Sequence, residues 1–252
     1  QHNPKCLHCV GHSLGGALAQ LTALWARERG IPAKLYTFGA PRVVIGKYVP
    51  LAQINIEHYR MIHGADPVPK IPIWPFSHTA GEYVLSMNNN AVFSPKTHSM
   101  ETSPGYVNTL SSYKSFDEMS HKYYAMNNKV TRLKYTDRAQ VSFSQYWQQR
   151  ITDGLITFLK DNGIYAGIMA QATLGLGMTF YDLLASSIYH VAKASVDAAE
   201  EAKGLLGCML SFAGKKHQQI KSLSIEFIRW VFELMVKALN RMAKMAIDML
   251  AK

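Results

Sequence analysis

The sequence predicts an α/β protein, in which a parallel sheet in the first part of the chain is followed by an all-helical region. Short apolar runs alternate with helical pattern up to about residue 85, with glycine or proline at the joints. All ten prolines lie at or before Pro104. Beyond about residue 164 the apolar residues follow helical periodicity, without strand alternation.

The elements of the first part follow from these patterns in order. Strands are expected at Cys6–Val10, Leu35–Phe38, His58–His63 and Glu82–Leu85, and a helix of strong helix formers at Leu14–Glu28. Residues 88–116 are rich in Asn, Ser, Thr, Pro and Gly and are interpreted as a long loop or insertion. The catalytic region is predicted to cover residues 1–160, and a helical region residues 161–252.

The composition excludes several classes of protein. The chain has 252 residues, of which 48% are hydrophobic, so it is neither disordered nor collagen-like. Three cysteines are too few for a disulfide scaffold. A formal net charge of +10 favours anionic partners. Because the chain opens at Gln1 with polar residues, we expect a processed product or a piece of a longer protein.

The strongest motif is Gly11-His12-Ser13-Leu14-Gly15, directly after a predicted strand and directly before a predicted helix. In this setting G-x-S-x-G predicts a sharp turn that presents a nucleophilic serine, Ser13, with glycine on each side to avoid collisions. The start of the helix adds partial positive charge where an oxyanion would form. The backbone N–H of Leu14 is therefore expected to be an oxyanion donor.

A serine nucleophile needs a base and a carboxylate that orients the base, here expected in the chain order Ser, Asp, His. Asp66 follows the predicted strand His58–His63 and precedes two prolines, which suits a fixed acid. The pattern alone would favour an Asx turn or a solvated loop carboxylate. His12 is expected to point away from the site, and composition does not choose between His78 and His121 as the base.

Three segments in order resemble the class 3 (fungal-type) lipase family: Gly11–Ala19, Tyr36-Thr37-Phe38-Gly39-Ala40-Pro41-Arg42-Val43 and His63-Gly64-Ala65-Asp66-Pro67-Val68-Pro69. A weaker resemblance continues through His78 to Tyr83 and to His121-x-Tyr123-Tyr124. The resemblance implies an α/β-hydrolase fold and a serine hydrolase of glycerolipid esters. It implies Ser13 as nucleophile, Asp66 as orienting acid and His121 as general base, with His78 as the alternative. No cofactor or metal is expected.

The chain also departs from that family. Class 3 lipases have several strands, a lid and a second oxyanion donor before the serine, whereas only twelve residues precede Ser13 here. We therefore expect an exposed sheet edge and a complementary N-terminal segment or chain that completes the catalytic unit.

The helical region has two notable stretches. Residues 162–181 are uncharged and long enough to cross a bilayer, but their glycines and polar residues favour a buried hairpin helix. In the last helix, Glu226, Arg229, Glu233, Lys237, Asn240, Lys244 and Asp248 form one polar stripe beside a methionine-rich apolar face. This pattern favours a largely buried bundle helix over one that docks on a membrane or a partner.

The function predicted is cleavage of glycerolipid esters through an acyl-enzyme, with membrane phospholipid favoured over triglyceride because of the positive charge and the apolar helices. The alternatives are a pseudoenzyme, or a toxin-like module whose helical end binds a membrane, immunity protein or carrier. We expect a secreted or membrane-associated protein. Cys6 and Cys9 are interpreted as buried thiols, and the basic residues between 114 and 150 as a rim for anionic headgroups, with no nucleic-acid partner.

Overall fold

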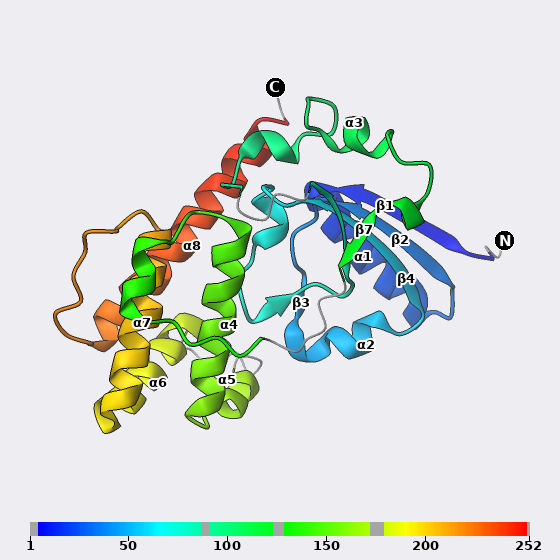
Figure 1. Ribbon diagram of the computed structural model, residues 1–252. Coiled ribbons are helices and arrows are strands. Elements are labelled where there is room, and N and C mark those ends of the chain that lie inside the picture. The colour runs from blue at the N-terminus through cyan, green and yellow to red at the C-terminus, as the bar shows by residue number, and fades with distance from the viewer. Residues whose placement is uncertain (1–4, 87–90, 123–128, 172–178, 251–252) are drawn as a thin grey trace. The chain divides into compact units, whose positions relative to one another are not determined.

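The computed structural model describes residues 5–86, 91–122, 129–171 and 179–250. The chain forms two compact units: residues 1–126 with residues 239–252, and residues 127–238. The second unit therefore begins before the predicted boundary at residue 161, and the end of the last helix belongs to the first unit (Figure 1).

A five-stranded sheet organises the first unit, in the order β1 (Leu7–His12), β2 (Ala33–Phe38), β4 (Ile56–His63), β6 (Glu82–Ser86) and β7 (Ser120–Lys122). The first four strands are parallel and β7 is antiparallel to β6. A separate antiparallel ladder joins β3 (Val44–Ile45) to β5 (Phe76–Ser77). The predicted α/β class and its four parallel strands are confirmed.

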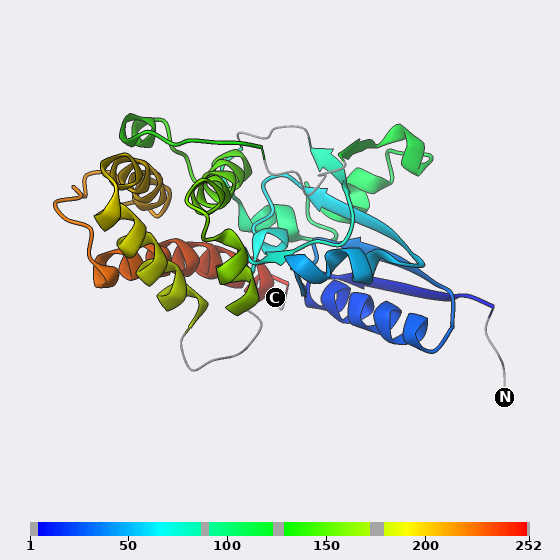
Figure 2. The ribbon, with the colours of Figure 1, turned by 90° about the horizontal axis from the view of Figure 1, so that it is seen from below.

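Helix α1 (Ser13–Glu28) covers one face of this sheet. Its alanines pack on alternate residues of β1 and β2, in a core of Cys9, Ala19, Ala23, Ala26, Ala33 and Leu35. The other face of the sheet carries Tyr36, Tyr59 and Tyr83, whose rings stack from strand to strand. Phe116 lies against these rings, so the segment that follows β6 covers this face (Figure 2).

Short helices connect the strands of the first unit. The α-helices are α2 (Val49–Gln53) and α3 (Tyr106–Leu110). The 3-10 helices are η1 (Gly46–Tyr48), η2 (Val68–Lys70), η3 (Pro95–His98) and η4 (Phe116–Glu118). Residues 88–116, predicted as a loop, thus contain η3 and α3.

Strand β1 forms one edge of the sheet, since among the described residues it pairs only with β2. Beside this edge, the outward face of α1 exposes Leu14, Leu18, Leu21 and Trp25 at helical spacings of 4, 3 and 4. The expected open edge is therefore present in the described chain, next to an uncovered apolar helix face.

The second unit is helical, with η5 (Tyr135–Ala139), α4 (Gln145–Asp161), α5 (Tyr165–Gln171), α6 (Phe180–Ala194), α7 (Val196–Phe212) and most of α8 (Ile225–Asp248). Side-chain caps begin three helices: Ser144 for α4, Thr179 for α6 and Ser195 for α7. At Gly204 a Cβ atom would lie 1.9 Å from the carbonyl oxygen of Leu133, so α7 needs glycine where this loop crosses it.

The polar stripe predicted on α8 is present. Glu233 accepts from Arg229 and Lys237, each at 3.1 Å, and Arg229 also pairs with Asp182 on α6 at 2.9 Å. The opposite side is buried through Ile228, Val231, Phe232 and Met235. The bundle interpretation is thus correct for this part of α8, whereas Met245 and Met249, assigned to the same apolar face, are about half exposed.

The uncharged run at 162–181 is not one helix. It contains the seven residues of α5 and the start of α6, and residues 172–178 lie outside the described part of the chain. Among the described helices, none combines the length and the hydropathy needed to span a bilayer.

Candidate active site

The turn between β1 and α1 has the geometry predicted for a nucleophile. Ser13 has a φ of 55°, a left-handed conformation that is strained for a residue with a side chain. A Cβ at Gly11 would lie 2.2 Å from the carbonyl oxygen of Gly15, and one at Gly16 would lie 2.6 Å from the Cβ of Ala40. At Gly15 a Cβ would meet nothing within 4 Å, so the predicted need for glycine is correct before Ser13 and wrong directly after Leu14.

A buried hydrogen-bonded chain leads from this serine to a carboxylate. The Oγ of Ser13 lies 2.8 Å from Nε2 of His98, and Nδ1 of His98 lies 2.8 Å from Oδ2 of Asp66. Ser13 is 6% exposed, and His98 and Asp66 are 0% exposed. Because a carboxylate only accepts, Nδ1 carries the proton and Nε2 is free to accept one from the serine hydroxyl.

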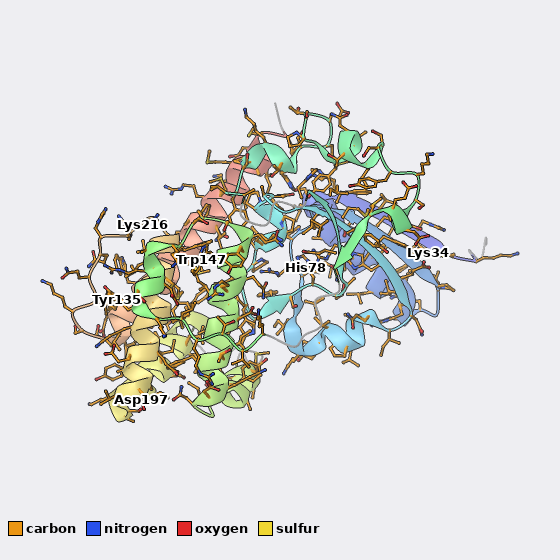
Figure 3. The ribbon with its side chains drawn as sticks, in the orientation of Figure 1. Lys34, His78, Tyr135, Trp147, Asp197 and Lys216 are labelled. Atoms are coloured by element: carbon orange, nitrogen blue, oxygen red, sulfur yellow. The ribbon has the colours of Figure 1, made fainter. Side chains whose placement is uncertain are left out.

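The histidine between Ser13 and Asp66 is His98, not the predicted His121. His121 lies on β7, where it is paired in register with Tyr83. Tyr123 and Tyr124, which were quoted with it, lie outside the described residues. His78, labelled in Figure 3, also lies elsewhere, because its Nε2 contacts the carbonyl oxygen of Pro69 at 2.7 Å. Both candidate bases are therefore replaced by His98, at the end of η3.

His98 was missed because it stands in the polar segment interpreted as an insertion. It satisfies the chain order Ser, Asp, His as well as His121 does. Catalytic residues are concentrated on loops that a rigid sheet positions, so the polar composition was no reason to pass over this histidine.

Asp66 is held by three donors. Its Oδ1 accepts from the backbone N–H of Val68 at 2.9 Å, and its Oδ2 accepts from Tyr106 at 2.6 Å as well as from His98. Tyr106 is fully buried, and burial next to this carboxylate raises its pKa well above the ordinary value, so its hydroxyl stays protonated as a donor. The prediction that Asp66 sits in a rigid turn is consistent with this geometry.

His12 lies at the turn between β1 and α1 and contacts the segment that carries His98. Its Nε2 lies 2.8 Å from the carbonyl oxygen of His98, and the two rings are 4.6 Å apart. Burial, followed by the neighbouring His98, lowers the pKa of His12 to about 4, so the ring is neutral near pH 7. His12 therefore helps to fix the backbone of His98, whereas the sequence suggested that it points away.

Polar groups also hold the loop that follows Asp66. Nη1 of Arg42 donates to the carbonyl oxygens of Lys70 and Pro72, each at 2.8 Å, while His78 holds Pro69. Desolvation lowers the pKa of Lys70 to about 8. Nearby, Arg60 and Glu82 form an ion pair at 3.0 Å whose side chains are each 3% exposed. Removing one partner of such a buried pair is costly, so this pair ties β4 to β6 beside the loop.

The remaining site predictions have mixed outcomes. Leu14 lies in the first turn of α1, where backbone N–H groups have no acceptor within the helix, as an oxyanion donor requires. Cys9 is buried as expected, whereas Cys6 is partly exposed. In the predicted basic rim, Arg132 pairs with Asp161 at 2.6 Å and with Glu201 at 3.8 Å. The rim itself stays a prediction.

Several known proteins are similar to this chain over part of its length. A secreted mono- and diacylglycerol lipase 1 of Fusarium solani is 44% identical over 79 residues, which are 30% of this chain and 24% of that protein. The secreted mono- and diacylglycerol lipase A of Penicillium camembertii is 44% identical over 91 residues, 34% of this chain and 29% of that protein. The toxin TseL of Vibrio cholerae is 43% identical over 76 residues, 29% of this chain and 12% of that toxin.

A solved structure, the mono- and diacylglycerol lipase from Aspergillus oryzae, is 35% identical and aligns over 34% of this chain and 33% of that one, with a TM-score of 0.31. The chain thus spans less than a third of the length of the two fungal relatives named above. Residues 2–76 match the family described as lipase (class 3). They include the turn at Ser13, β2 and the following Gly39, and the loop of Asp66. Over residues 2–76 the chain is therefore similar to the class 3 lipases.

Proposed function

We propose that the protein is a serine hydrolase that cleaves carboxylic ester bonds of glycerolipids. The observation that carries this proposal is the buried chain from Ser13 through His98 to Asp66, with 2.8 Å at each step. It supports a role for the three residues as nucleophile, base and orienting acid. The similarity to lipases over residues 2–76 supports the ester as the bond that is attacked.

In the proposed reaction, Oγ of Ser13 attacks the ester carbonyl carbon while its proton passes to Nε2 of His98. The charge that develops on the carbonyl oxygen is stabilised by the N–H of Leu14 at the start of α1. The C–O bond to the alcohol then breaks, and His98 returns the proton to the leaving oxygen. Water, activated by the same imidazole, releases the fatty acid from the acyl-enzyme and restores Ser13.

Labelling with a fluorophosphonate tests the nucleophile. We expect the protein to be labelled, the Ser13→Ala variant to remain unlabelled, and Ser111→Ala, on an exposed turn, to be labelled like the parent protein. Labelling that persists in Ser13→Ala would overturn the assignment and favour the pseudoenzyme alternative.

As the finer substrate preference, we propose membrane phospholipid over neutral triglyceride. The formal net charge of +10 supports it, since anionic headgroups would concentrate at the protein. Release of fatty acid from phosphatidylglycerol liposomes should exceed release from tributyrin. The reverse ranking would contradict this preference. The names of the relatives, a toxin and secreted lipases, support an action outside the producing cell.

We propose, in addition, that a complementary polypeptide segment extends the sheet at β1. The open edge of this strand and the exposed row Leu18, Leu21 and Trp25 on α1 support it, because parallel sheets are normally covered on both faces. In the active enzyme, Leu21→Cys should react with a thiol reagent more slowly than Val130→Cys, which replaces an exposed valine. Equal rates would contradict the covering segment. Binding of an immunity or carrier protein by residues 161–252 stays a prediction.

A further inference from the structure

The last part of α8 packs on the loop that holds the triad carboxylate. Ala243 and Ala246 form a buried cluster with Val68, against which Ile71 is partly buried. Val68 is the residue whose N–H donates to Oδ1 of Asp66 at 2.9 Å. Residues 239–250 therefore lie next to the site within the first unit, outside the family match at residues 2–76.

Exposed apolar side chains flank the polar stripe at this helix end. Met245 is 50% exposed, Ile247 41%, Met249 48% and Leu250 41%. Met245 and Met249, at i and i+4, form an apolar patch on one side of the stripe, and Ile247 and Leu250, at i and i+3, lie on the other side. Methionine adapts its shape readily, which suits contact with a fluid or variable surface.

Positive charge borders this patch. Arg241 and Lys244 are exposed one turn before Met245 and Ile247, and Asp248 is the one acidic residue between positions 239 and 250. Apolar side chains flanked by Lys and Arg are the combination with which amphipathic helices bind the surface of an anionic bilayer. The positive charge therefore favours an anionic partner over a neutral one, and the exposed apolar side chains beside it favour a phospholipid surface over an acidic protein.

The patch and the serine lie at the same end of the strands. Val68 and Ile71 follow β4, and Ser13 follows β1. Because these strands are parallel, their carboxyl ends meet along one side of the sheet. Figures 1 and 2 both draw the C-terminal end of α8 beside the carboxyl ends of the strands. Leu14, next to the serine, is 63% exposed here.

We propose that residues 241–250 form an interfacial docking surface, through which the protein binds anionic phospholipid bilayers with the triad next to the lipid. This inference rests on the proposed function, because docking would bring the ester substrate to Ser13. The docking itself requires no catalysis and is measured without it.

The test uses the full chain with Ser13→Ala, so that the vesicles are not consumed, and cosedimentation with vesicles of phosphatidylcholine and phosphatidylglycerol. We expect Met245→Asp with Met249→Asp to weaken binding by on the order of tenfold or more, because the apolar contacts are lost and like charge is introduced. The matched control is Val196→Asp, which places the same charge on an 81% exposed valine at the start of α7 and should leave binding unchanged.

A second pair of variants tests the charge. Arg241→Gln with Lys244→Gln should weaken binding several-fold at low salt and reduce its salt dependence. Binding of the methionine variant equal to that of the Val196→Asp control, or equal binding to vesicles of phosphatidylcholine alone, would overturn the proposal. With Ser13 restored, hydrolysis of p-nitrophenyl butyrate, which needs no lipid surface, distinguishes a lost docking surface from a lost triad. Absence of that hydrolysis in the unmutated protein would instead count against the proposed function.

Discussion

Tyr106 and His98 donate to the same oxygen of the triad carboxylate, Oδ2 of Asp66, at 2.6 and 2.8 Å. The tyrosine thus competes with the imidazole for one acceptor. A hydrogen bond to a charged group contributes about 1.5–3 kcal/mol, so this contact bears on how strongly Asp66 holds an imidazolium as well as on where it lies. Tyr106 is a positioning residue, since it reaches the reacting atoms only through Asp66.

In the proposed reaction, the change Tyr106→Phe should lower kcat by roughly tenfold, because the carboxylate that orients the base loses one of its donors. KM should stay close to that of the parent protein, since Tyr106 reaches Ser13 only through Asp66 and His98. The measurement is kcat and KM for a soluble ester. A raised KM with an unchanged kcat would contradict the positioning role.

His98→Ala should reduce kcat by at least about 10⁴-fold, because loss of the triad base leaves the serine hydroxyl without a proton acceptor. His121→Ala and His78→Ala are the matched comparisons. His121→Ala should retain its rate, and His78→Ala should lose stability rather than chemistry, since it releases the carbonyl of Pro69. Rates of soluble ester hydrolysis and urea midpoints measured on all three variants check this. An inactive, folded His121→Ala would restore the original assignment.

The lowered pKa of His12 predicts that the stability of the fold depends on pH. Its pKa is lowered to about 4 in the folded chain, against about 6.5 when unfolded, so between these values the unfolded state binds more protons. The contribution of this residue to stability is therefore fully present well above pH 6.5 and is lost as the pH drops towards 4. His58, whose pKa burial lowers to about 3, acts in the same direction.

The variant His12→Gln keeps a donor but does not titrate, so its free energy of unfolding should fall less between pH 7 and pH 5 than that of the parent protein. Urea unfolding at both values measures it. The control His190→Gln, at an exposed position on α6, should behave like the parent. Parallel curves for all three proteins would contradict the role given to His12.

Residues of the sheet could be predicted because their signals are local. Leu35 and Phe38 sit in an apolar run, and Gly11 precedes a serine at a strand-to-helix turn, so neighbours in sequence decide the structure. His98 could not be identified in this way, because it meets Ser13 only after 85 residues of chain have folded. The same holds for Tyr106, an ordinary tyrosine in sequence that becomes a donor to Asp66 through tertiary packing.

Gly39 connects these distant residues and gives the sharpest test of the site. Its φ of 59° already favours glycine, and an added Cβ would lie 2.7 Å from Oδ2 of Asp66, 2.9 Å from Nδ1 of His98 and 2.9 Å from the hydroxyl of Tyr106. Gly39→Ala should therefore displace the carboxylate and the base together, and lower kcat by on the order of 10²-fold. Gly30→Ala is the matched control, because Gly30 has a φ of 72° but no atom within 4 Å of a Cβ. It should carry the backbone strain, about 1–2 kcal/mol of stability, with its rate retained. Soluble ester kinetics and urea unfolding of both variants separate the two effects, and equal rates would show that the site tolerates a methyl group where His98, Asp66 and Tyr106 meet.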